Sequence, residues 1–189
     1  MPRIALDIDS TLHHYWDLLA DLAQRHFGVE LPYEQQRGWG IERLEPAQLE
    51  QVIRETHSDQ NIETAEPYPD AVETVRAWHA EGHWIHVTSH RAEGTRQATA
   101  RWLERIGMPY DDLHCSYDKV TRCVELGIDV LVDDSPVNLE NAHEQGILGA
   151  TIVHPWNAEI AEREWVIGAR DWRELRERLE PVLAPGRRP

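Results

Sequence analysis

The 189-residue chain contains two cysteines, one lysine and no apolar run approaching the roughly 20 residues of a membrane-spanning helix. Cys115 and Cys123 are too few for a disulfide framework, so we expect reduced, half-buried thiols without a functional role. The first residues also lack the basic segment and apolar core of a secretory signal. We therefore expect a cytoplasmic protein that does not bind membranes.

Positive charge is scarce, because 19 Lys and Arg residues face 34 Asp and Glu residues and the formal charge is −15. A nucleic-acid polymer would be repelled by almost the whole surface. A small anion can still bind where a metal ion and a few aimed donors reverse the field locally. With 41% apolar residues the chain can bury one core with a modest insertion, as a monomer or a homodimer.

Short apolar runs alternate with segments of helical periodicity along most of the chain. The runs that predict strands are 3–9, 84–88, 112–115 (the weakest), 128–133, 149–153 and 165–167. The segments that predict helices are 69–82, 93–106, 118–126, 136–145 and 171–183. This alternation predicts an α/β fold with a doubly wound, parallel, Rossmann-like sheet, whose ligand site lies beyond the carboxyl ends of the strands.

Residues 12–66 interrupt this alternation. They contain helical patterns at 13–27 and 46–56, separated by a glycine-rich stretch at 38–40. We predict a small helical cap inserted after the first strand. Residues 1–11 and 67–185 then form the Rossmann-like core.

Two of the predicted strands run directly into pairs of acids, Asp7 with Asp9 and Asp133 with Asp134. Residues two apart on a strand point the same way, so Asp7 and Asp9 are both expected to reach the site. Clustered carboxylates repel one another, and a divalent cation or a proton relieves that repulsion. The alternative is a pair of acidic turns that only cap helices. An EF-hand loop fits worse, because its sixth and twelfth positions would be Leu12 and Leu18.

The second predicted strand ends in Thr88, Ser89 and His90, where hydroxyls and free backbone amides suit phosphate oxygens. Lys119 is the single lysine beside 18 arginines, and its compact ammonium can neutralise a phosphate next to carboxylates. The alternatives are an ordinary turn and a surface lysine. For Arg91 and Arg96 we favour solvated arginines at a helix start over contact with an anion.

These four stretches resemble the four motifs of the haloacid-dehalogenase superfamily: DIDST at 7–11, the strand that ends at Thr88, Lys119, and VDD at 132–134. The resemblance covers residues 3–9 and about 67–153. It implies a magnesium-dependent phosphohydrolase in which Asp7, the backbone carbonyl of Asp9, and Asp134 hold Mg²⁺, with Asp133 in or beside the coordination sphere.

The same resemblance implies the chemistry. Asp7 attacks phosphorus, and Asp9 protonates the leaving oxygen and then activates the water that hydrolyses the phospho-aspartate. Thr88 and Lys119 hold phosphate oxygens, and Ser89 and His90 are further candidates. An acid at position 9 is typical of the superfamily's phosphatases and phosphomutases, whereas its dehalogenases lack it.

Three further segments, 65–91 (AEPYPDAVETVRAWHAEGHWIHVTSHR), 154–157 (HPWN) and 170–175 (RDWREL), resemble the 5′-nucleotidases of the deoxy(pyrimidine), cytosolic type C family and their bacterial relatives. The resemblance implies a small phosphate monoester as substrate, a nucleoside monophosphate first of all. A sugar phosphate or another small metabolite is the alternative, followed by a retired enzyme that only binds metal or phosphate. Trp16 and Trp39 of the cap are candidates for stacking on a base, and packing is the alternative for both.

Overall fold

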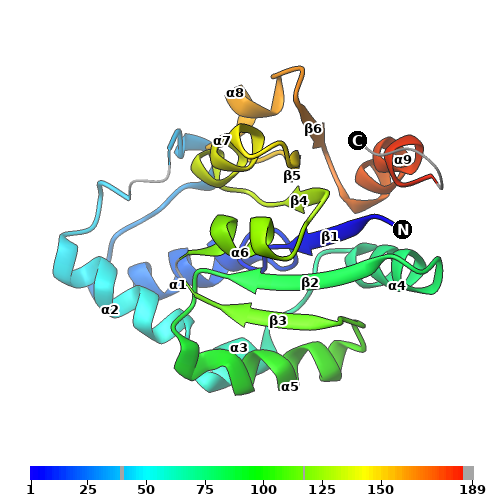
Figure 1. Ribbon diagram of the computed structural model, residues 1–189. Helices are drawn as coiled ribbons and strands as arrows, with labels where there is room; N and C mark the ends of the chain where they lie inside the picture. Colours follow the sequence, from blue (N-terminus) through cyan, green and yellow to red (C-terminus); the bar gives the residue numbers. More distant parts are fainter. Residues whose placement is uncertain (39–40, 117, 185–189) are drawn as a thin grey trace.

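The computed structural model describes residues 1–38, 41–116 and 118–184 of the chain. These residues form one parallel six-stranded sheet in the order β3-β2-β1-β4-β5-β6 (Figure 1). The strands are β1 (Arg3–Leu6), β2 (Trp84–Ser89), β3 (Asp112–Cys115), β4 (Val130–Val132), β5 (Leu148–Ile152) and β6 (Val166–Ala169). Strands β2 and β3 follow on one side of β1, and β4, β5 and β6 follow on the other side. Open α/β sheets bind ligands at such a switch point, which here lies between β1 and β4.

The predicted fold class is confirmed, and each of the six predicted strands is present. The largest difference lies in the first strand, which was predicted to reach residue 9 but ends at Leu6. The chain turns immediately afterwards, since the N–H groups of Thr11 and Leu12 both donate to the Ile8 carbonyl oxygen, at 3.2 and 2.8 Å. Asp7 and Asp9 therefore stand on a turn, and the alternation of a strand does not govern them.

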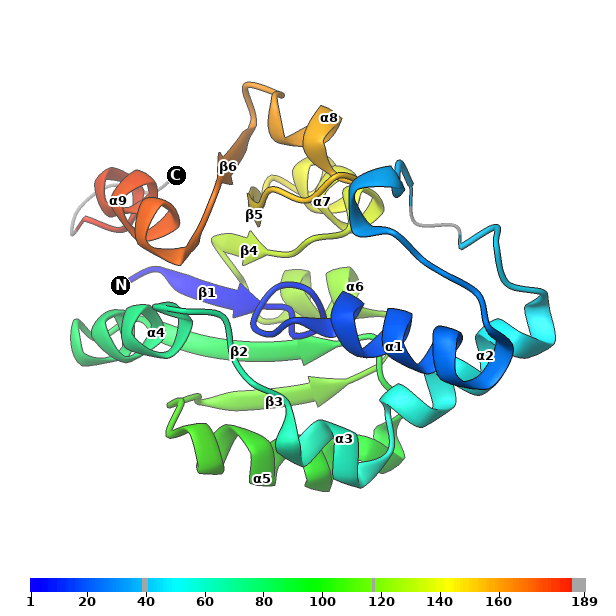
Figure 2. The same ribbon diagram turned by 180° about the vertical axis from the view of Figure 1, so that it is seen from behind.

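Helices cover both faces of the sheet. The helices after the insertion are α4 (Ala71–Ala80), α5 (Arg96–Ile106), α6 (Lys119–Glu125), α7 (Pro136–Glu144), α8 (Ala158–Ala161) and α9 (Trp172–Leu183), with a 3-10 turn η2 (Glu93–Thr95) before α5. The α6 and α7 helices lie in front of the sheet in Figure 1, and α4 and α9 lie in front of it in the reverse view of Figure 2.

Side chains of β1 alternate between these two layers. Ile4 and Leu6 belong to the cluster that contains Trp78 of α4, whereas Ala5 packs in the cluster that contains Cys123 of α6. This alternation follows from the two-residue period of a strand. A central strand that is apolar on both faces matches the continuous apolar run from which it was predicted.

The insertion between β1 and α4 contains α1 (Tyr15–Phe27), η1 (Tyr33–Gln35), α2 (Pro46–Thr56) and α3 (Asp59–Thr64). The α1 and α2 helices lie beyond the carboxyl ends of β1, β2 and β3 (Figures 1 and 2). The α3 helix was not predicted, and it packs against α5 with Ile62 in the main core cluster. The assignment of residues 12–66 to a cap remains a prediction, and Ile62 shows that its last helix shares the core.

The final helix anchors the turn that follows β1. Its predicted cap, Asp171, accepts a hydrogen bond from the Glu174 N–H at 2.8 Å. The next residue, Trp172, is buried against Trp78 and donates its indole N–H to the Thr11 carbonyl oxygen at 2.9 Å. The loop that carries the first acids is thus fixed from the opposite end of the sequence.

Within the described residues, no helix is both long and apolar enough to cross a membrane. Cys115 and Cys123 are free thiols, as predicted, and both are buried rather than half-buried.

The buried strand β4 yields a stability prediction with a matched control. Val130→Ala should lower the free energy of unfolding by about 1.5–3 kcal/mol, because two methyl groups leave a fully buried site and a cavity remains. Val137→Ala should change it by less than about 0.5 kcal/mol, since Val137 is 59% exposed. Urea unfolding of both variants measures the difference, and equal losses would contradict this account of the core.

Candidate active site

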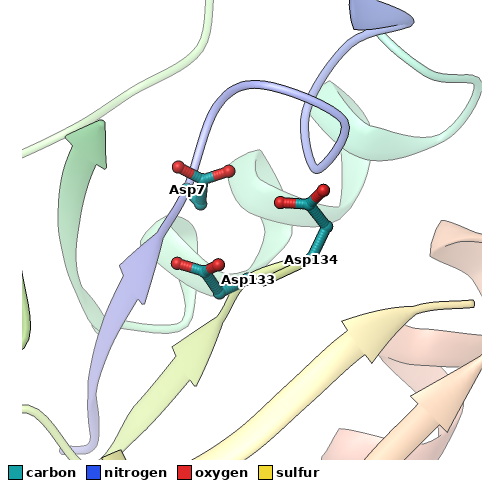
Figure 3. Close-up of side chains that lie close together, drawn as sticks. All are labelled: Asp7, Asp133 and Asp134. Carbon is teal, nitrogen blue, oxygen red and sulfur yellow. The ribbon is translucent and has the colours of Figure 1, made fainter. Parts of the chain in front are cut away.

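The carboxyl ends of β1 and β4 bring three carboxylates together. Leu6 pairs with Val132 in the parallel register, and the Asp7 N–H donates to the Val132 carbonyl oxygen at 2.9 Å. The next residues of both segments are therefore neighbours. Oxygens of Asp7, Asp133 and Asp134 lie within 4.8 Å of one another, and the three buried side chains converge in Figure 3.

Lys119, in the first turn of α6, extends into this cluster. Its Nζ donates to Asp7 Oδ1 at 2.5 Å and to Asp133 Oδ2 at 2.8 Å, and the residue is 2% exposed. Burial alone would lower the pKa of Lys119, but the charges of Asp133 and Asp7 raise it above its usual value. The surface-lysine alternative is therefore wrong, because Lys119 is a buried ammonium paired with two carboxylates.

The cluster has a deficit of positive charge. Burial, partly offset by Lys119, raises the pKa of Asp7 to about 7, and repulsion from Asp133 contributes. Burial and the charges of Asp7 and Asp133 also raise the pKa of Asp134 well above its usual value. A divalent cation would relieve this repulsion, and carboxylate oxygens are the ligands that Mg²⁺ prefers. The residues present therefore fit a divalent metal ion.

The protein itself already satisfies much of the hydrogen-bonding capacity of Asp133. In addition to Lys119, Asp133 accepts from the Ser135 N–H at 2.8 Å and from Asn138 Nδ2 at 3.1 Å on each oxygen. Asp133 thus holds Lys119 in place more than it offers free oxygens. Sequence reasoning missed Asn138. The feature that could have indicated it is its position in the first turn of a helix, three residues after the cap Ser135.

Asp9 faces a different environment from Asp7. Its carboxylate accepts two hydrogen bonds from Arg91, Nη2 to Oδ1 at 2.5 Å and Nε to Oδ2 at 3.1 Å. His13 Nε2 lies 2.9 Å from Oδ1, and His57 Nε2 lies 3.3 Å from Oδ2. We call Arg91, His13 and His57 the Asp9 cage. Ser10, with φ of 61°, turns the chain directly after Asp9.

The Asp9 cage corrects one sequence interpretation. Arg91 was expected to be solvated at a helix start, but it is 2% exposed and also donates to Thr99 Oγ1 at 3.3 Å. Although burial raises the pKa of Asp9, the charge of Arg91, the hydrogen bond with His13 and the proximity of His57 lower it well below its usual value. Asp9 is therefore an anion in this arrangement. Sequence reasoning missed His13 and His57, because neither belongs to one of the four motifs. The available signal for His13 was its position four residues after Asp9.

The residues at the end of β2 divide into two groups. Thr88 is fully buried, and its hydroxyl finds no hydrogen-bond partner within the part of the chain that the structure describes. Ser89 is also buried, with its Oγ 3.5 Å from Asp9 Oδ2. Only His90 of the three lines the cavity at the carboxylates. The phosphate contacts of Thr88 and Ser89 remain predictions.

A cavity of about 290 Å³ opens at the carboxylates. The core lines it with Asp7, Asp9, His90, Lys119, Asp133, Asp134, Ser135 and Asn138. The insertion adds Tyr15 and Ile53, together with His57 of the Asp9 cage. This volume lies near the lower end of the roughly 300–1,000 Å³ typical of small-molecule sites, so the cavity suits a small ligand.

Trp16 lies outside the lining of this cavity. It is 9% exposed, stacks on Trp156 with a ring separation of 5.4 Å, and borders a separate hollow of about 670 Å³. Its packing is thus observed, while contact with a base remains a prediction. The other cap candidate, Trp39, lies outside the described residues.

The parallel sheet, the inserted helices and the carboxylate–lysine cluster match the arrangement expected of a phosphohydrolase of the haloacid-dehalogenase type. Solved structures with this fold include a haloacid-dehalogenase family hydrolase from Deinococcus radiodurans R1 with bound phosphate and sodium (TM-score 0.66, 18% identity, 98% of each chain covered). Another is a predicted phosphoglycolate phosphatase from Haemophilus somnus 129pt (TM-score 0.64, 16% identity, 96% of this chain and 98% of that chain). At these identities they show the fold alone.

The family follows from the sequence. The profile of the family described as "5' nucleotidase, deoxy (Pyrimidine), cytosolic type C protein" matches residues 1–181, so the chain belongs to this family and is a hydrolase of the phosphatase and nucleotidase type. A relative in Chlorobaculum tepidum, described as a "Putative 5'(3')-deoxyribonucleotidase", is 25% identical over 193 residues that cover 95% of this chain and 91% of the relative.

The raised pKa of Asp7 predicts a pH-dependent effect in the metal-free protein. An acid whose pKa is raised by folding adds stability below its unfolded pKa, and this contribution is lost as pH rises through about 7. Asp7→Asn mimics the protonated acid. It should therefore stabilise the protein at pH 8 by about 1–3 kcal/mol more than at pH 5.

Chemical unfolding in the presence of a chelator measures this difference at both pH values. Asp21→Asn, on the solvent-exposed side of α1, serves as the control and should give equal small effects. A gain from Asp7→Asn that is the same at pH 5 and pH 8 would contradict the prediction.

Proposed function

We propose that the protein is a Mg²⁺-dependent phosphomonoesterase that forms a phospho-aspartate on Asp7 and acts on nucleoside monophosphates, in the manner of a 5′-nucleotidase. The observation that carries the proposal is the buried cluster of Asp7, Asp134 and Lys119 at a small cavity in a member of a nucleotidase family. The family description also supports a cytoplasmic location.

The carboxylates of Asp7 and Asp134, with the backbone carbonyl of Asp9, are the proposed holders of Mg²⁺, and Asp133 lies beside them. The bound cation would neutralise the carboxylates and the charge that develops on the phosphoryl group. The protein's net charge of −15 makes this local neutralisation a condition for binding an anionic substrate.

In the first step, an Asp7 carboxylate oxygen forms a bond to phosphorus while the bond to the leaving oxygen breaks. The leaving oxygen takes the electron pair of that bond and a proton from Asp9. Lys119 is the proposed donor to one phosphate oxygen, and the hydroxyl of Thr88, which has no hydrogen-bond partner among the described residues, is the proposed second donor. Ser89 and His90 are additional phosphate contacts in this scheme.

In the second step, a water oxygen attacks the phosphorus of the phospho-aspartate while Asp9 accepts a proton from that water. The bond between phosphorus and the Asp7 oxygen breaks, which releases inorganic phosphate and restores the Asp7 carboxylate. The Asp9 cage suits this base role, because it keeps Asp9 ionised. The acid role in the first step needs a protonated Asp9. The contacts of Asp9 with Arg91 must therefore loosen when substrate is bound.

Asp7→Asn tests the nucleophile. Turnover should fall below about one thousandth of the wild-type value, because the amide cannot form the covalent intermediate. After acid quenching with a ³²P-labelled substrate, the wild-type protein should retain label and Asp7→Asn should not. Asp21→Asn is the matched control and should behave as wild type. Unaltered turnover in a folded Asp7→Asn protein refutes the mechanism.

A substrate panel with Mg²⁺ tests specificity. We expect deoxynucleoside 5′- or 3′-monophosphates to give the highest kcat/KM, above sugar phosphates and a generic aryl phosphate. We also expect a chelator to abolish turnover. If nucleotides react no better than the aryl phosphate, the nucleotidase assignment fails. A sugar phosphate that outperforms all others would identify the protein as a phosphatase of that metabolite class.

A further inference from the structure

The segment between β5 and α8, residues 154–157, contacts both loops that carry the acids. Asn157 Nδ2 donates to the Asp134 carbonyl oxygen at 3.1 Å and to Thr151 Oγ1 at 3.0 Å. His154 Nε2 lies 2.7 Å from the Ser10 carbonyl oxygen, in the turn after Asp9. The segment therefore ties the loop after β1 to the loop after β4.

Trp156 of this segment contacts a carboxylate of the cluster directly. Its indole Nε1–H donates to Asp134 Oδ2 at 3.0 Å, and both residues are buried, at 8% and 2% exposure. Across the residues that the structure describes, no other side chain donates to this carboxylate. A neutral donor fixes the direction of the carboxylate without cancelling its charge, so Asp134 stays available to a cation.

Aromatic rings fix the direction of the Trp156 indole in turn. The His154 ring stacks on it with a separation of 4.5 Å and an angle of 4°, and Trp16 of α1 stacks on it at 5.4 Å and 30°. Tyr33 meets it edge-on at 5.6 Å, and its hydroxyl lies 2.7 Å from His154 Nδ1. Trp16 and Tyr33 belong to the insertion. The insertion therefore contacts the indole that donates to Asp134.

We propose that Trp156 is a positioning residue for Asp134, and that its stack with Trp16 makes the cation affinity of the carboxylate cluster depend on the packing of α1 against the core. This inference rests on the proposed function, because it requires that the cluster binds a divalent cation. Hydrogen-bonded neighbours of metal ligands commonly change metal affinity by about 10–100-fold.

The test is the dissociation constant of Mg²⁺, measured by titration calorimetry on the full chain without substrate. Trp156→Phe retains an aromatic ring in the stack and removes the N–H donor. It should weaken Mg²⁺ binding by about tenfold or more. The matched control is Trp102→Phe, which also loses a buried indole hydrogen bond, to the Ala65 carbonyl oxygen at 2.9 Å, but contacts none of the three carboxylates.

The outcomes separate the two proposals. Mg²⁺ binding by wild type and by Trp156→Phe with equal affinity overturns the role of Trp156 and leaves the proposed function standing. Failure of the wild type to bind Mg²⁺ overturns both. Equal losses in Trp156→Phe and Trp102→Phe would assign the effect to general destabilisation and also overturn the role.

A second pair of variants tests the same stack if Trp156→Phe does not fold. Trp16→Phe keeps a ring against Trp156, whereas Trp16→Ala removes it, and neither touches a carboxylate directly. Mg²⁺ should bind to Trp16→Ala several-fold more weakly than to Trp16→Phe. Equal dissociation constants for the pair would refute the link between α1 and the cluster.

Discussion

Three carboxylates buried around one ammonium form the constraint on which the rest of this structure depends. Burial of unpaired charge is costly, so the cluster persists only because the sheet, two helix starts and specific donors fix it. The parallel register sets Asp7 beside Asp133, and α6 supplies Lys119. The remaining excess of negative charge makes the site suited to a cation, since a neutral cluster would gain little from one.

Two acids that stand two residues apart are driven to opposite protonation behaviour. Burial raises the pKa of Asp7 to about 7, while the cage of Arg91, His13 and His57 brings the pKa of Asp9 well below its usual value. Environments that separate the pKa values of neighbouring acids are typical of paired catalytic roles. His57 belongs to the insertion, so the inserted helices contribute to the electrostatics of the site and to the walls of its cavity.

The sequence predicted the architecture and the meeting of acids because parallel strands align their carboxyl ends, and Lys119 stood out as the single lysine. The orientation of the individual side chains was harder to predict. The orientation of Asp9 depended on β1 ending at Leu6, a boundary that an apolar run does not mark. Arg91 is one of many arginines, and its burial results from tertiary contacts that local pattern does not encode. The part played by Trp156 depends on a tertiary stack for the same reason.

The central position of β1 has a consequence for biosynthesis. Asp7 and its partner Lys119 are separated by 112 residues, and β1 pairs with β4 through Ile4 and Val130. A ribosome therefore releases the middle strand long before its neighbours β2 and β4, so the apolar strand stays unpaired while the inserted helices emerge. No truncated translation product that stops before β4 can assemble the carboxylate cluster, so competence appears only late in synthesis.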